Sequence, residues 1–249
     1  MRLLLSCLLL LALCGCKKTE SSAPDLLSRA KAALSAREAK LVSFRYEGVT
    51  AQGDQRAGFV LAWRAPGKLR AEFTATGLTF AFDGRHFAQW DPRTKVLTRV
   101  DLEQSERDEV SGFLHQAFAP FVPEGWRSPL LAGALEARAS VEGGRDLVAL
   151  SARSGEVEVT YLFTSPAYDF FGKRVRGGGE ARVLAQHCEA GLGLCFPARI
   201  EEIVPGAAPA LTTLAGIVVN GPLAPEVFEL QAPEGARVET RTLEQLSAR

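Results

Sequence analysis

The residue types that most often perform chemistry are few in this chain, which has five cysteines and three histidines among 249 residues. His86, His115 and His187 stand apart in the sequence, and none belongs to an H-E-x-x-H or similar metal-binding pattern. The sequence G-x-S-x-G is absent, so a serine nucleophile has no local support. These patterns predict that the chain is not an enzyme and that it holds no metal or other cofactor.

Residues 1–15 are typical of an export signal. Cys14 lies near the end of this segment, and Cys16 directly follows it. Arg2 precedes an apolar run over residues 3–13 that is too short to span a bilayer as a helix. The sequence Leu13-Cys14-Gly15-Cys16 that follows resembles the lipobox of bacterial lipoproteins. This resemblance implies that the signal is cut before Cys16 and that lipid is attached to the Cys16 sulfur. An ordinary secretory signal cut nearby is the alternative, and both interpretations export the protein.

A lipidated Cys16 would anchor the rest of the chain to a membrane, because two or three acyl chains hold a protein there durably. Residues 16–24 are polar and predict a flexible tether, and residues 25–249 predict a single domain. Position 17 is Lys and not Asp, which by resemblance to the sorting rule of Gram-negative lipoproteins favours the periplasmic face of the outer membrane. That rule differs between bacterial groups, so anchoring in the inner membrane stays open.

Charge and hydropathy restrict the partners of this domain. The chain has 29 basic and 29 acidic residues, so it offers no field that would attract nucleic acid. No second run of about eighteen apolar residues is present, and the N-terminal lipid is therefore the expected membrane attachment.

Cys188 and Cys195 are the cysteines that remain in the predicted domain. They flank residues 189–194, whose two glycines suit a reversal between strands, and an exported protein favours oxidised thiols. We therefore predict a structural disulfide between them. Metal binding with the adjacent His187 is the competing interpretation, although this spacing does not match the usual zinc patterns.

The remaining chain has the periodicity of a few helices and many strands. Apolar residues recur at helical spacing over residues 24–41 and 103–121. Alternation at period two, with Gly, Asp and Pro between the runs, predicts an antiparallel meander. The predicted strands include Phe44–Tyr46, Phe59–Trp63, Leu69–Phe73, Leu78–Phe82, Leu135–Val141, Leu147–Ala152, Val157–Phe163, Ala181–His187, Phe196–Val204, Leu211–Asn220 and Val227–Leu230. Residues 173–179 read as a basic, flexible loop.

The order of these segments resembles the Lol-type lipoprotein carrier and receptor superfamily. The resemblance is carried by the leading helix with Leu34, by residues 63–70 (WRAPGKLR), by Phe82-Asp83-Gly84 with Phe87 and Trp90-Asp91-Pro92, and by Val227–Leu230 before Pro233 and Gly235. It implies a mainly β (α+β) fold, a strongly curved antiparallel sheet that forms a half-open β-barrel with helices covering its concave apolar face. The soluble carrier has Arg directly before the strand-ending Pro; here Ala65 holds that place, so the role of that Arg in latching the helical lid is not transferred to Arg64.

The resemblance also implies a function, the non-covalent binding of acyl chains of a lipid or lipoprotein, for transport or receipt at the outer membrane. The residues expected to line the hydrophobic cavity are Phe44, Tyr46, Trp63, Phe73, Phe80, Phe82, Phe113 and Phe118. Each of them could instead be ordinary core, since most buried aromatic residues only pack. The alternative function is therefore a structural or sensory envelope lipoprotein, whose barrel is packed solid and whose surface binds an envelope protein partner.

We predict that Cys16→Ser releases or mislocalises the protein and that Cys14→Ser does not. Thioether formation needs a sulfur at the cut site, and of these two cysteines only Cys16 follows a small residue. Membrane fractionation with intact mass measurement checks this. A Cys16→Ser protein that still carries diacylglycerol would contradict the assignment.

Overall fold

The computed structural model describes residues 23–117, 136–154 and 156–247, which form helices and a series of strands. The first part contains α1 (Ala23–Glu38), β1 (Ser43–Gln52), β2 (Gln55–Arg64), β3 (Lys68–Phe73), β4 (Leu78–Phe82), β5 (His86–Asp91), β6 (Val96–Asp101) and α2 (Gln104–Ala117). The second part contains β7 (Glu136–Glu142), β8 (Arg145–Ser154), β9 (Val157–Thr164), β10 (Phe170–Val175), β11 (Glu180–Glu189), β12 (Leu194–Ile203), β13 (Ala210–Val219), the 3-10 helix η3 (Pro225–Phe228), β14 (Arg237–Arg241) and α3 (Leu243–Ser247).

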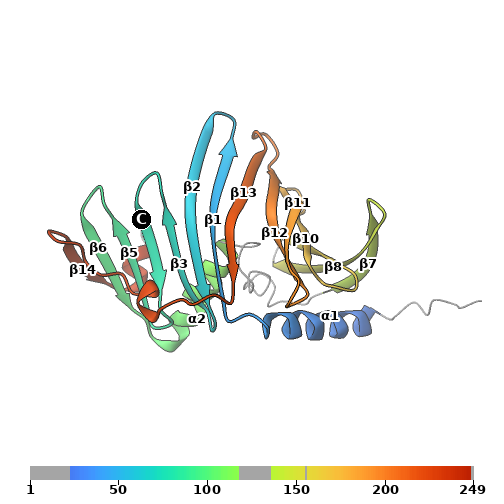
Figure 1. The fold of residues 1–249 in the computed structure, drawn as a ribbon, viewed down its shortest axis with the longest axis horizontal. Coiled ribbons are helices and arrows are strands. Elements are labelled where there is room, and N and C mark those ends of the chain that lie inside the picture. Colours follow the sequence, from blue (N-terminus) through green and yellow to red (C-terminus); the bar gives the residue numbers. More distant parts are fainter. Residues whose placement is uncertain (1–22, 118–135, 155, 248–249) are drawn as a thin grey trace, which may run out of the picture.

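All described strands belong to one strongly curved sheet (Figure 1). Its order is β14-β6-β5-β4-β3-β2-β1-β13-β12-β11-β10-β9-β8-β7, so β13 pairs with β1 in the middle while β14 and β7 form the two edges. Because the edges do not pair with each other, the barrel stays half open. The predicted mainly β architecture is confirmed.

The faces of the sheet follow from the alternation along each strand. On β1 and β2, Tyr46, Leu61 and Trp63 are at most 1% exposed on the concave face, whereas Arg45 points to the convex face. Trp63 is aligned with Phe44 on β1 and with Leu69 on β3, so this concave face continues across three strands. The buried positions define a central cluster made of Leu41, Phe44, Tyr46, Phe59, Leu61, Trp63, Leu69, Ala71, Leu194, Phe196 and Leu214.

Two helices cover the two ends of the concave face. Ala30 and Leu34 of α1 pack with Val148, Tyr161 and neighbouring residues of β7, β8 and β9. At the other end, Val110 and Leu114 of α2 pack on Phe82, Phe87 and Val100. The described apolar residues of both predicted helical stripes therefore face the sheet.

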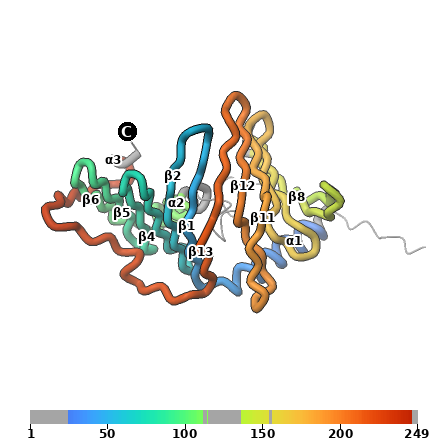
Figure 2. Tube along the Cα trace, turned by 45° about the horizontal axis from the view of Figure 1, so that its top comes forward, coloured from blue at the N-terminus to red at the C-terminus, as the bar shows by residue number. Residues whose placement is uncertain are grey.

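The convex face is crossed by a long C-terminal segment, residues 220–236, which we call the strap (Figure 2). Three arginines on convex positions of β2, β3 and β6 donate hydrogen bonds to its carbonyl groups. Arg64 reaches the carbonyl of Leu223 at 3.0 Å, Arg70 that of Val227 at 3.2 Å and Arg99 that of Leu230 at 3.1 Å. Arg64 thus holds the strap on the convex face.

The beginning and end of the strap are also fixed. The Asn220 carboxamide accepts from the backbone N–H of Val42 at 2.7 Å and donates to the carbonyl of Lys40 at 2.8 Å. At the far end, β14 adds to β6 in parallel, and Leu243 of α3 then packs against the cluster beneath α2. The chain therefore wraps one edge of the sheet and ends on the opposite face.

Two expectations from the sequence are wrong. Val227–Leu230 does not form a strand: Pro225 begins η3, and Phe228 and Leu230 turn inward to be buried against the convex face. Residues 173–179 are not wholly a loop, since β10 runs to Val175. Arg174 there donates to both carboxylate oxygens of Glu142, at 2.8 and 2.7 Å, and this pairing allows a charged residue to lie in the strand.

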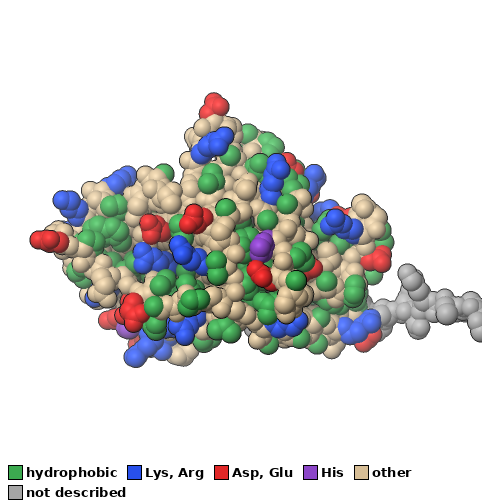
Figure 3. All heavy atoms as spheres, in the orientation of Figure 1, with side chains coloured by type: hydrophobic (Ala, Val, Ile, Leu, Met, Phe, Trp, Pro, Cys, Tyr) green, Lys and Arg blue, Asp and Glu red, His purple; other side chains and the backbone are tan. Residues whose placement is uncertain are grey.

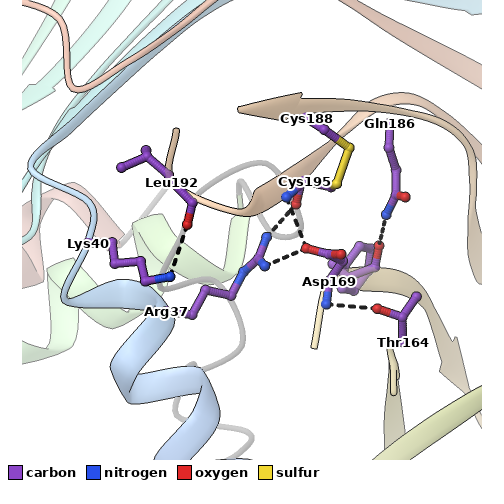
Figure 4. A network of polar contacts seen from close by, with 9 residues as sticks. Arg37, Lys40, Thr164, Asp169, Gln186, Cys188, Leu192 and Cys195 are labelled. Atoms are coloured by element: carbon purple, nitrogen blue, oxygen red, sulfur yellow. Dashed lines mark hydrogen bonds and ion pairs between the residues drawn. A yellow bond between two sulfur atoms is a disulfide. The ribbon is translucent and has the colours of Figure 1, made fainter. Parts of the chain in front are cut away.

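A buried polar clamp joins the end of α1 to the connection between β9 and β10 and to the start of β12 (Figure 4). Arg37 donates to the Asp169 carboxylate and to the carbonyl of Cys195, and the Cys195 N–H donates to the same carboxylate at 3.0 Å. The side chains of Arg37 and Asp169 are only 13% and 10% exposed. Burial lowers the pKa of the Arg37 guanidinium, and the neighbouring Asp169 carboxylate opposes that shift.

The predicted disulfide between Cys188 and Cys195 is confirmed. The two cysteines are directly paired on β11 and β12, seven positions apart in sequence. Closing so short a loop stabilises the native state by about 2.5 kcal/mol on the chain-entropy model. With both sulfur atoms in this bond they are not thiolate ligands, and His187 contacts Glu189 at 2.9 Å, so the metal interpretation of this segment is wrong.

We predict that Asp169→Ala lowers the free energy of unfolding by about 3 kcal/mol, because it leaves the buried Arg37 without its counter-charge. Urea denaturation measures this change. The matched control is Asp25→Ala, which removes an exposed pair with Arg29 and should cost about 0.5 kcal/mol. Equal losses in the two variants would contradict the clamp.

Candidate functional site

A row of aromatic side chains crosses the concave face from β12 to β5. Its members are Phe196, Phe44, Tyr46, Phe59, Phe73, Phe80 and Phe87. Neighbouring rings that contact each other have centroids 4.7–6.1 Å apart, and Phe59 and Phe73 are aligned across β2 and β3. These separations are those of edge-to-face and offset aromatic contacts. We call this set the aromatic row.

The row joins the central cluster to the cluster beneath α2. Among the predicted cavity residues, Phe44, Tyr46 and Trp63 lie in the central cluster and are at most 2% exposed. Phe73 packs at the margin of that cluster, and its ring lies 6.1 Å from that of Phe80. The described members of the predicted set therefore lie in one continuous apolar layer, although they belong to two packing clusters.

Of the other predicted cavity residues, some lie in the cluster beneath α2 and the rest have side chains outside the described part of the chain. Phe82 is buried beneath α2, with Phe80 partly buried beside it. Phe113 belongs to α2, but its side chain is outside the described part, and Phe118 is outside the described residues altogether. Cys16 also lies outside them.

Three members of the aromatic row were not among the predicted cavity residues: Phe59, Phe87 and Phe196. The signal for Phe59 was present, since it stands four positions before Trp63 on the same strand and therefore shares its face. Phe196 could not be placed in this way, because its contact with Phe44 depends on the pairing of β13 with β1.

The middle of the concave face differs from its ends in what packs on it. In the part of the chain that the structure describes, the side chains of α1 and α2 belong to the two end clusters and none belongs to the central cluster. The clamp marks the boundary toward α1, where the Arg37 guanidinium carbon lies 5.6 Å from the Phe196 ring centroid. The central cluster is thus the part of the apolar face that lies between the helices.

The polar groups on this face are few. Tyr46 is fully buried, and burial raises the pKa of its phenol well above the ordinary value, so the group stays neutral. The hydroxyl groups of Thr50 and Thr212 bond to each other at 2.8 Å. Toward α1, Lys173 lies 5.9 Å from the Tyr161 ring; burial lowers its pKa, and the Glu202 carboxylate opposes this shift. The surface therefore suits an apolar ligand better than a charged one.

The convex face has a different character, with acidic and basic side chains interspersed along the strap (Figure 3). A pocket of about 410 Å³ lies between β4–β6 and the strap, lined by Asp83, His86, Arg99 and Glu229 among others. Burial raises the pKa of Asp83, but hydrogen bonds from His86 and from the backbone N–H groups of His86 and Arg85 outweigh that effect and lower it. These bonds make Asp83 the turn former that its position before Gly84 indicated.

The described residues contain neither a cluster of metal ligands nor a helix that could span a membrane. No group of three or more His, Cys, Asp or Glu residues there is arranged to hold a metal ion. Within the same residues, no helix is both long enough and apolar enough to cross a bilayer.

The fold can be compared with solved structures. The chain is similar to a LolA superfamily protein from Nitrosomonas europaea, with a TM-score of 0.52 and 14% identity over 81% of this chain and 97% of that one. A putative outer membrane lipoprotein-sorting protein domain from Vibrio parahaemolyticus gives a TM-score of 0.55 and 10% identity over 82% and 95%. The chain has a Lol-type fold.

The chain is also similar to a third solved structure. It is a DUF1329 family protein from Desulfovibrio piger, with a TM-score of 0.57 and 10% identity over 82% of this chain and 97% of that one. No family model and no curated protein matches the sequence. At these identities the likeness concerns the fold.

A tight contact inside the site gives a test of its packing. A Cβ atom added at Gly48 would stand 2.3 Å from the Phe59 ring, so Gly48→Ala should displace the ring and cost about 1–3 kcal/mol. At Gly191 an added Cβ meets nothing within 4 Å, so Gly191→Ala should change stability by less than about 0.5 kcal/mol. Urea denaturation compares the two variants. Equal stability would show that Phe59 does not lie over the β1 backbone.

Proposed function

We propose that this chain is a lipid-anchored periplasmic protein that binds acyl chains of a lipid or lipoprotein on its concave face, for transport or receipt at the outer membrane. The observation that carries the proposal is the aromatic row, whose middle lies between the two helix-covered ends of the sheet. Lol-type structures support it, since one similar structure is described as an outer membrane lipoprotein-sorting domain.

Acyl chains fit such a surface for a physical reason. Burial of a methylene group contributes about 0.8 kcal/mol, so about ten methylenes contribute about 8 kcal/mol before the cost of ordering the chain. Attraction of this kind is non-directional and needs no reacting group. The proposed role is therefore binding without catalysis.

The anchor completes the proposal. If Cys16 carries lipid, residues 17–22 separate it from α1, which begins at Ala23. A fully extended stretch of this length reaches about 25 Å, so the domain would stay close to the membrane surface. The concave face would then work within reach of the bilayer that supplies or accepts the acyl chain.

Two neighbouring residues on β13 test the proposal, because they point to opposite faces. Ile217 packs against the central cluster, whereas Val218 is 47% exposed on the convex face. We predict that Ile217→Glu weakens binding of a fluorescent palmitoyl probe at least tenfold, since its carboxylate must lose water beside methylenes. Val218→Glu should bind as the wild type does.

Circular dichroism of both variants shows whether each retains its secondary structure. Equal probe binding by the two folded variants would exclude the concave face as the binding surface. A wild-type protein that binds no probe would instead favour the packed envelope lipoprotein.

A further inference from the structure

Among the described residues of the central cluster, Trp63 has a buried side-chain polar atom that is left without a hydrogen-bond partner. It lies on β2, aligned with Phe44 on β1 and Leu69 on β3, and is 1% exposed. Its Nε1–H donor is inaccessible to solvent and has no hydrogen-bond acceptor among the described atoms. Buried indole N–H groups usually find an acceptor, so this one needs an explanation.

Packing alone does not explain a tryptophan at this position. An indole N–H can only donate, and a buried donor without an acceptor is destabilising. A phenylalanine would supply an aromatic face without that cost, as Phe44 and Phe59 do in the same cluster. An acceptor that arrives from outside the chain would satisfy this donor.

We infer that Trp63 Nε1 donates a hydrogen bond to the carbonyl oxygen of an ester-linked or amide-linked acyl chain. This rests on the proposed function and adds what the site recognises in its ligand. The surroundings are apolar, so the acceptor belongs to a molecule that is otherwise hydrocarbon at this depth. A carbonyl at the start of an acyl chain meets this requirement, because it places one neutral acceptor next to a run of methylenes.

The location of Trp63 also orients the ligand. The partly buried Phe73 and Ile217 pack at the margin of the central cluster, and Trp63 lies within it. Since Trp63 is sealed from solvent, the entering chain must part such marginal side chains before its carbonyl reaches the indole. The ester or amide carbonyl of the ligand then lies at Trp63 on β2, and its hydrocarbon chain extends along the aromatic row.

Two lipids that differ only in the carbonyl groups test the inference. The mature chain, residues 16–249, carries Cys16→Ser, so that it has neither the predicted signal nor the predicted lipid, and is titrated with dioctanoyl phosphatidylglycerol and with its dioctyl ether analogue. The protein that retains Trp63 should bind the ester lipid about fivefold more tightly than the ether lipid, because one net hydrogen bond changes the dissociation constant by about that ratio. The Trp63→Phe variant should bind both lipids equally. The control variant Trp90→Phe, whose tryptophan packs against Leu97 and Leu230 on the convex face, should keep the preference for the ester.

A spectroscopic measurement gives the answer even if Trp63→Phe does not fold. The indole N–H resonance of Trp63, assigned by elimination with Trp90→Phe and Trp126→Phe, should move downfield with the ester lipid and not with the ether. Equal affinity for the two lipids in the wild type, as expected if a buried water accepts the bond, would overturn the inference while leaving acyl binding intact. If neither lipid binds, the proposed function fails as well.

Discussion

A strongly curved sheet that does not close must cover its concave apolar face, and most of the structure follows from this constraint. Large apolar surfaces are unfavourable in water, so both amphipathic helices pack against that face at its two ends. The buried Arg37–Asp169 pair fixes where α1 stops, at the edge of the aromatic row. Among the described residues, the apolar side chains of α1 pack in the cluster on β7 to β9 and not in the central cluster, and this separation is the basis of the proposed binding surface.

On the convex face, hydrogen bonds from arginine side chains hold the strap in place. Arginines from β2, β3 and β6 hold the strap by its carbonyl groups, and Phe228 and Leu230 fill the space beneath it. Such bonds satisfy the backbone of a segment that joins no sheet over most of its length. Acidic and basic side chains are interspersed on this face (Figure 3), whereas the aromatic row makes the concave face the one suited to hydrocarbon.

Alternation at period two made the faces of β1 and β2 predictable, because Phe44 and Tyr46 alternate along β1 and Phe59 and Trp63 share one face of β2. The disulfide followed from its short spacing and two turn glycines. The path of the strap could not be predicted, since Val227–Leu230 has the pattern of a strand and its burial depends on arginines about 130–160 positions away. The parallel addition of β14 and the contact of Phe196 with Phe44 likewise arise only from tertiary pairing.

Photo-cross-linking tests the central claim most directly, that acyl chains lie along the aromatic row. A phospholipid with a diazirine on one acyl chain would be irradiated with the mature chain, residues 16–249, carrying Cys16→Ser, and the labelled residues would be found by peptide mass spectrometry. The account predicts labels on concave positions of β1 to β4 and β13, such as Phe73 and Ile217, that an excess of unlabelled lipid removes. Labels confined to the strap and the convex positions of the same strands would contradict it.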